Sequence, residues 1–99
     1  MRQEAALLRE ARDSAELTNA IGLHARPSVK LTQVAKGFGA TIEIATAPDG
    51  PWTDAKSLVR IMRIKAAQGE TLFVRAHGAD AASAVTAVAD LIRRNFDED

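Results

Sequence analysis

The sequence contains no cysteine, which excludes disulfide bonds, thiolate zinc sites and cysteine nucleophiles. It has only two histidines, His24 and His77, and they lie far apart along the chain. Because such a pair forms no local metal-binding motif, we expect no metal site and no cofactor. Aromatic residues make up 4% of the chain, which leaves few rings to stack on nucleic acid bases.

An excess of charge is also missing, since 13 Lys and Arg residues balance 13 Asp and Glu residues. A neutral chain has no bulk attraction for nucleic acid or anionic membranes. No apolar run approaches the roughly 20 residues of a membrane span. The start, "MRQEAALLREARDSAE", lacks the apolar stretch and cleavage site of a signal peptide. We therefore expect a soluble cytoplasmic protein without membrane insertion and without a nucleic acid partner.

The 99 residues, of which 46% are hydrophobic, suffice for one domain with a modest core, and we expect a monomer. The first residues are rich in Ala, Leu, Arg and Glu, which favour a helix, but their apolar face is narrow. We expect residues 1–14 to be an N-terminal extension, helical or disordered, and residues 15–99 to form the domain.

Alternating apolar residues and turn signals predict short strands. The "APDGP" turn separates the second strand from the third and indicates a hairpin. The expected strands span residues 15–21, 40–46, 52–56 and 71–77.

Helix signals alternate with these strands. Pro27 can open a helix that Gly37 or Gly39 ends, and Ser57 can cap a helix over residues 57–67. Apolar residues at helical spacing predict a last helix over residues 80–96, followed by a frayed acidic tail. The element order predicts an α+β open-faced sandwich, in which three helices cover one face of a four-stranded, mostly antiparallel sheet.

The stretch "GLHARP" places a histidine directly before a predicted helix start. Unpaired N–H groups and the helix dipole favour an anion there and disfavour an imidazolium, so His24 is expected to be neutral near pH 7, as a nucleophile must be. Arg26 adds a planar fork that suits phosphate oxygens. This combination suits transient capture of a phosphoryl group. A capping or surface histidine is the alternative.

A second candidate, Ser57, stands at the start of the predicted helix 57–67 in "DAKSLVRIM", preceded by Lys56. A phosphate on its hydroxyl would sit well against the helix dipole, although a plain capping serine explains the same position. Not all apolar residues of this helix can face inward together, so some apolar surface is expected to be left for a partner.

From Glu16 to Phe96 the chain resembles the HPr family, the histidine phosphocarrier proteins of the bacterial phosphotransferase system. "GLHARPSV" is similar to the family's active-site motif, and "KSLVRIM" lies where its regulatory serine falls. The resemblance implies a carrier that does not turn over alone as an enzyme: His24 accepts a phosphoryl group on Nδ1 from phosphorylated enzyme I and passes it to a IIA-type domain in sugar transport or regulation.

The resemblance also implies roles for neighbouring residues. Arg26 would stabilise the phosphohistidine, at a helix start formed by Pro27 and Ser28 that supports the anion. Ser57 would be the target of an HPr kinase/phosphorylase. The residues expected to contact partner proteins are Leu23, Leu58, Val59, Met62, Arg60 and Arg63.

Three cations, Arg60, Arg63 and Lys65, depart from the family pattern. Family members usually carry small residues in this helix. Together with Lys56, these cations could dock an acidic partner, pair with a phosphate on Ser57, or be solvated. The loop "TAPDGPW" is also long for the family. These departures suit a member that serves a particular sugar, a nitrogen-linked branch or a dihydroxyacetone kinase relay.

Three other readings of the chain are weaker. A nucleic-acid-binding module would need a broad basic patch with stacking aromatics. A regulator acting only by docking and Ser57 phosphorylation would not need both His24 and Arg26. A carrier of apolar ligands has no positive sign in the sequence. The relay reading is therefore preferred.

Overall fold

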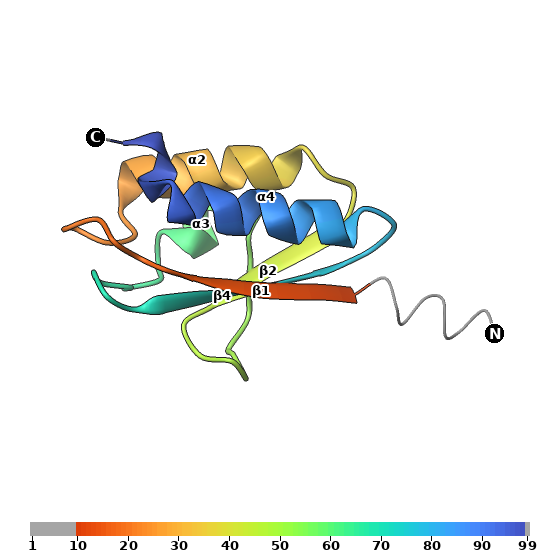
Figure 1. The fold of residues 1–99 in the computed structure, drawn as a ribbon, viewed down its shortest axis with the longest axis horizontal. Helices are drawn as coiled ribbons and strands as arrows, with labels where there is room; N and C mark the ends of the chain where they lie inside the picture. Colours follow the sequence, from red (N-terminus) through yellow and green to blue (C-terminus); the bar gives the residue numbers. More distant parts are fainter. Residues whose placement is uncertain (1–9, 99) are drawn as a thin grey trace.

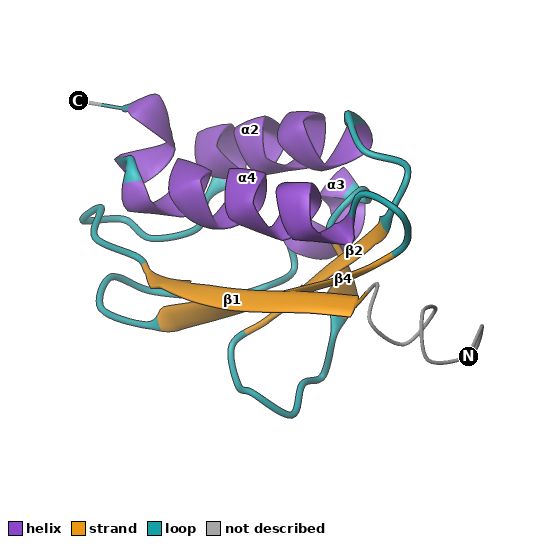
Figure 2. Ribbon diagram, turned by 45° about the vertical axis from the view of Figure 1, so that its right-hand side comes forward, coloured by secondary structure: helices purple, strands orange, loops and turns teal. Residues whose placement is uncertain are grey.

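The computed structural model describes residues 10–98. Its strands are β1 (Glu10–Glu16), β2 (Thr41–Ala45), β3 (Thr53–Asp54) and β4 (Thr71–His77), all antiparallel, in the order β1-β4-β2-β3. The helices are α2 (Ala25–Lys36), α3 (Leu58–Ile61) and α4 (Ala81–Arg93), followed by a 3₁₀ turn, η1 (Asn95–Asp97). All helices lie on one face of the sheet (Figures 1 and 2). The predicted α+β open-faced sandwich is confirmed.

The core lies between the sheet and helices α2 and α4. Period-two alternation on β2 and β4 and helical spacing on α2 and α4 direct apolar side chains into this layer. The largest fully buried apolar side chains of these four elements are Ile42, Ile44, Leu72, Val74, Leu31, Val88 and Ile92.

The first strand lies earlier than predicted, at Glu10–Glu16 instead of residues 15–21. Residues 10–14, expected in a helical or disordered extension, pair with β4 along their length. Their Glu, Ala and Arg favour a helix locally, but pairing with β4 overrides that preference. Ala11 and Ala15 face the core, while Arg12 faces away from it. Residues 1–9 of the predicted extension lie outside the described residues.

Helix α3 is also shorter than predicted, since it covers Leu58–Ile61 and not residues 57–67. The N–H groups of Arg63 and Ile64 bond carbonyls three residues back, which tightens the last turn and ends the helix. Ala66 lies outside any helix or strand, and its carbonyl accepts a hydrogen bond from the Leu23 N–H. This contact to another segment takes the place of a helical bond.

The chain end is ordered up to Glu98, so the prediction of a tail that frays after Phe96 is wrong for these residues. Helix α4 ends at Arg93, and Asn95, Phe96 and Asp97 then adopt left-handed backbone with φ of 58°, 56° and 58°. Such residues cost about 1–2 kcal/mol each. Burial of the Phe96 ring, 1% exposed, offsets part of this cost, and the tail packs back against α2.

The β2–β3 loop projects from the sheet on the side away from the helices (Figures 1 and 2). At its end the Trp52 ring lies under the guanidinium groups of Arg75 and Arg12, at 4.2 Å and 5.8 Å from the ring centroid. The part of the chain that the structure describes contains no helix long and apolar enough to span a membrane. Nor does it gather three or more acidic or histidine side chains into a metal site.

Asp13 ties β1 to α4 and makes stability depend on pH. The backbone N–H of Ser14 and the guanidinium of Arg93 donate to its carboxylate at 2.7 Å and 3.0 Å, and they lower the pKa of Asp13 below its usual 3.8. A carboxyl with a lowered pKa in the folded state adds stability above its ordinary pKa. That stability is lost as the pH falls through the lowered value.

We therefore expect Asp13→Asn to lower the free energy of unfolding at about pH 6 and to have much less effect at about pH 2. Urea unfolding at both pH values measures the difference. Asp49→Asn, in the exposed β2–β3 loop, is the control and should change neither value. An equal loss at both pH values for Asp13→Asn would show that its charge is not the cause.

Candidate functional site

His24 occupies the N-cap of α2 in extended backbone, with φ −124° and ψ −164°, and its ring makes no capping hydrogen bond. The imidazole is partly exposed and is thus free to react. The helix begins at Ala25, two residues before the predicted opening at Pro27. Pro27 lies buried in the first turn, where its missing N–H costs no helical bond. The backbone N–H groups of Ala25 and Arg26 lack helical carbonyl partners and lie next to His24.

Ser28 holds the backbone of His24 in place. Its N–H donates to the His24 carbonyl at 2.9 Å, and its buried hydroxyl donates to the same oxygen at 2.6 Å. Both donors are therefore used inside the fold. In this structure Ser28 positions His24, and its predicted part in an anion-supporting helix start stays a prediction.

The loop before His24 is fixed by close backbone contact with the segment after α3. Gly22 has φ +82°, and a Cβ there would lie 2.4 Å from the Ala66 carbonyl oxygen. The N–H of Leu23 donates to that same oxygen at 3.0 Å. The Asn19 amide closes the loop from the other side by donating to the Gly22 carbonyl at 2.6 Å. Only glycine permits this approach.

Apolar side chains are exposed on α2, on α3 and in the loop before α2. Val59 and Met62, predicted as partner contacts, are 65% and 46% exposed. Leu23 is 7% exposed and packs in the core, so little of its side chain is available, and its role as a partner contact stays a prediction. Leu58 is half-buried.

Sequence reasoning missed two exposed apolar residues, Ile21 and Val29, at 72% and 37% exposed. Ile21 was assigned to a strand and lies in the loop instead. If the helix had been predicted to start at Ala25, Val29 would have been placed one helical turn after Ala25, on the exposed face of the helix. The earlier helix start is thus the signal that could have found it.

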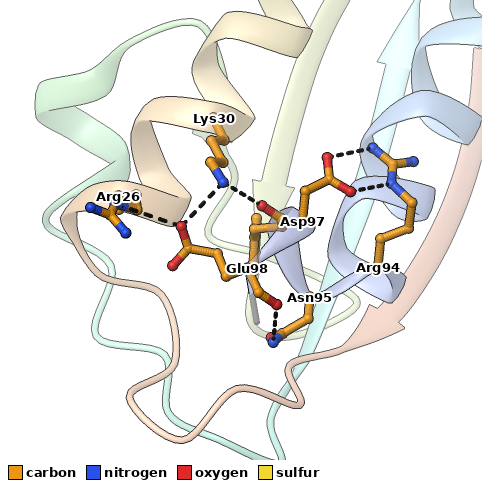
Figure 3. A network of polar contacts seen from close by, with 7 residues as sticks. Arg26, Lys30, Arg94, Asn95, Asp97 and Glu98 are labelled. Carbon is orange, nitrogen blue, oxygen red and sulfur yellow. Dashed lines mark hydrogen bonds and ion pairs between the residues drawn. The ribbon is translucent and has the colours of Figure 1, made fainter.

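The C-terminal tail reaches the start of α2 (Figure 3). The Glu98 carboxylate lies 3.1 Å from Lys30 Nζ and 3.7 Å from Arg26 Nε. Lys30 also donates to the Phe96 carbonyl at 2.8 Å, which holds the left-handed turn over the helix. Arg26 keeps 76% of its side chain exposed, so it is tethered only loosely. The Glu98 carboxylate therefore already pairs with Arg26, the side chain that is expected to bind a phosphoryl group.

Ser57 caps α3, with its hydroxyl accepting from the Arg60 N–H at 3.4 Å. Lys56, named above together with the cations that follow it, makes a different contact from Arg60 and Arg63. Lys56 Nζ donates to the Phe38 carbonyl at 2.7 Å, whereas Arg60 and Arg63 line a hollow beside the β2–β3 loop.

Comparison with known proteins agrees with this geometry. The model of the phosphotransferase-system HPr component phosphorylation site matches residues 11–94. The chain belongs to the HPr family. Phosphocarrier protein NPr of Escherichia coli K12 is 33% identical over 88 residues, covering 89% of this chain and 97% of the relative. Phosphocarrier protein HPr of Xylella fastidiosa is 36% identical, covering 84% of this chain and 91% of the relative.

Solved structures agree as well. An HPr of Thermoanaerobacter tengcongensis superposes with a TM-score of 0.80 at 34% identity, covering 90% of this chain and 98% of that one. Like its family, the protein is a phosphoryl carrier that forms a phosphohistidine intermediate, and it is not an enzyme that turns over alone. Its partners in the relay are enzyme I and IIA-type acceptors.

We predict that Gly22→Ala both destabilises the fold and slows phosphorylation by enzyme I. Positive φ and the backbone clash with Ala66 together should cost about 2–4 kcal/mol. Displacement of the loop also moves His24. Gly69→Ala is the matched control, because Gly69 has φ +91° but nothing within 4 Å of a new Cβ. Urea unfolding and initial phosphorylation rates should separate the two variants; equal rates would show that Gly22 does not position His24.

Proposed function

We propose that His24 is the residue that receives the phosphoryl group, through Nδ1, from phosphorylated enzyme I. The observation that carries this proposal is a partly exposed imidazole that makes no capping bond at the start of a 12-residue helix. In the transfer, the bond from phosphorus to the donor nitrogen breaks as the bond to His24 forms. Because a phosphorus–nitrogen bond keeps a high transfer potential, the group can then move on to a IIA-type domain.

Arg26 and the helix start then hold the added charge. A phosphoryl group brings a charge of about −1.5 to −2. The N–H groups of Ala25 and Arg26 and the positive end of the helix dipole favour that charge. The Arg26 side chain is exposed enough to swing from Glu98 onto the phosphoryl oxygens.

Finer assignments are part of the same proposal. The protein is a monomer, and its acceptor belongs to a sugar branch or a nitrogen-linked branch; relatives named HPr and NPr are similarly close, which supports both. Ser57 is proposed as a regulatory phosphorylation site for an HPr kinase/phosphorylase. Its exposed neighbour Arg60 could pair with the phosphate. A phosphate ester at Ser57 suits a switch, since it lacks the transfer potential of phosphohistidine.

Intact-mass analysis after incubation with enzyme I and phosphoenolpyruvate tests the proposal. We expect one added, acid-labile phosphoryl group, which is absent in His24→Ala. His77→Ala is the matched control, because His77 lies on β4 beside Glu10, at 3.3 Å. It should be phosphorylated like the wild type. Phosphorylation of His24→Ala would refute the assignment.

A second prediction concerns the tail. Glu98→Gln should raise the ratio of phosphorylated to free carrier by about two- to threefold at fixed phosphoenolpyruvate and pyruvate, because the exposed Arg26 loses a competing carboxylate. Asp97→Asn removes the same charge from the tail but affects Arg94 instead, and it should change the ratio less. Equal changes in both variants would indicate a general charge effect.

A further inference from the structure

The outer edge of β1 is closed at its centre by two side chains. We propose that Asp13 and Arg93 form a clamp over this edge, and that the edge pairs with β1 of a second copy of the chain once the clamp is removed. The clamp thereby keeps the carrier a monomer. The inference rests on the proposed function, which includes a monomeric carrier, and it supplies a cause for that state.

Strand β1 lies at the edge of the sheet, since the order β1-β4-β2-β3 gives it one neighbour. It pairs with β4 along all seven of its residues. An edge strand of this kind leaves a row of backbone N–H and C=O groups without strand partners, and such a row can pair with another chain. A carrier that stays monomeric therefore needs a device that blocks this row.

Every second residue of β1 directs its backbone groups to the outer edge. In an antiparallel pair, the N–H and C=O of one residue point to the neighbouring strand, and those of the next residue point away from it. Just beyond β1, the Leu17 N–H donates to the Glu70 carbonyl and the Gly69 N–H donates to the Leu17 carbonyl, both at 2.8 Å. Leu17 thus faces the β4 side. Counting back in steps of two, Asp13 also faces β4, and Ser14 faces the outer edge.

Side chains bond both outward groups of Ser14. Its N–H donates to the Asp13 carboxylate at 2.7 Å, and its carbonyl accepts from the Arg93 guanidinium at 3.0 Å. The same guanidinium nitrogen lies 3.0 Å from each oxygen of the Asp13 carboxylate, so a side chain from α4 holds the arrangement together. Because both groups of Ser14 are occupied, another strand cannot bond the centre of the edge.

The edge is open on either side of the clamp. Arg12 and Glu16 also direct their backbone groups outward, and within residues 10–98 no side chain bonds those groups. These two residues flank Ser14 at equal distances and carry opposite charges. In the single chain Arg12 bonds Glu10 at 2.6 Å, but 56% of its side chain is exposed and can turn to another molecule.

This arrangement of charge identifies the occupant as a second copy of the chain. If a second β1 lies antiparallel about a two-fold axis at Ser14, Arg12 of each copy lies opposite Glu16 of the other. Opposite charges directly across an antiparallel pair are favourable. A two-fold axis at Arg12 or Asp13 would instead oppose like charges. The strand is therefore complementary to itself in one register, which is centred on the residue that the clamp covers.

Sedimentation equilibrium of the full chain tests the clamp. We expect the average mass of the double variant Asp13→Ala/Arg93→Ala to rise about twofold between about 10 µM and about 1 mM, while the wild type keeps the mass of one chain. Arg94→Ala/Asp97→Ala is the matched control, because it removes a neighbouring ion pair that links α4 to the tail instead of to β1. It should stay monomeric. Circular dichroism confirms that each variant folds.

A third substitution shows whether the edge itself makes the contact. Ser14→Pro, added to the double variant, should restore the monomer, because proline has no N–H to donate to the second copy. Proline is tolerated on an edge strand where the N–H would face out of the sheet.

Cross-linking locates the centre of the pair. Because the chain has no cysteine, Ser14→Cys in the double variant gives each copy a single thiol. In the register centred on Ser14 the two Cα atoms lie about 5.5 Å apart, which a disulfide can span, so mild oxidation should link the copies. Glu10→Cys in the same double variant is the control. Its two thiols would lie about 25 Å apart along the strands and should link much less.

The outcomes separate this inference from the proposed function. If the wild type is itself a dimer, the proposed monomeric state fails. If the wild type and the double variant are both monomeric, the clamp inference alone is overturned. It is also overturned if Ser14→Pro leaves the dimer intact, if Glu10→Cys links as readily as Ser14→Cys, or if the control Arg94→Ala/Asp97→Ala associates equally. Failure of His24 to accept a phosphoryl group would overturn the proposed relay and leave the clamp in place.

Discussion

The close approach of Gly22 to Ala66 is the contact on which the site depends. The Ala66 carbonyl accepts the Leu23 N–H, and a Cβ on Gly22 would overlap that carbonyl. This contact fixes the loop that delivers His24 to the start of α2. It also favours a chain that is not helical after α3, because a carbonyl that bonds another segment does not take part in a helix. The same contact therefore sets both the position of His24 and the course of the chain after α3.

The early end of α3 at Ile61 determines where the side chains that follow it lie. In a longer helix, Arg63 and Lys65 would project from different sides of a cylinder. Because the helix stops at Ile61, both instead line one hollow with Arg60. The buried Ile61 anchors the turn to the core, while Val59 and Met62 stay outside. One turn of helix separates the core from a surface available to partners.

The sequence predicted the architecture because its strongest signals were also its structural determinants. The alternation in β4 and the helical spacing of α4 each bury one face, and both elements lie close to where they were expected. The errors have a shared physical origin. The β1 residues favour a helix locally, the α3 extension continues a helical pattern, and the acidic tail is polar. In all three, contacts with distant segments decide the outcome: β4, Leu23 and the start of α2.

The candidate site was predictable to the same degree. His24 and Arg26 could be proposed from the sequence because they lie two residues apart and their chemistry is local. Glu98 was missed because three left-handed residues turn the tail back, and no periodic pattern predicts such a turn. That Ser28 positions His24 was missed because sequence does not reveal which of its donors are already used.

The distribution of charge explains how a neutral chain can serve as a carrier. Near His24, Glu98 partly neutralises Arg26 and Lys30, so in the proposed transfer to His24 a phosphoryl group would replace one anionic partner of Arg26 with another. Such an exchange changes the energy of the site only modestly, which suits a group that must be accepted and then given away. Within residues 10–98, Arg60, Arg63 and Lys65 have no carboxylate at ion-pair distance, so the neutral chain combines a balanced area near His24 with a local positive area beyond α3.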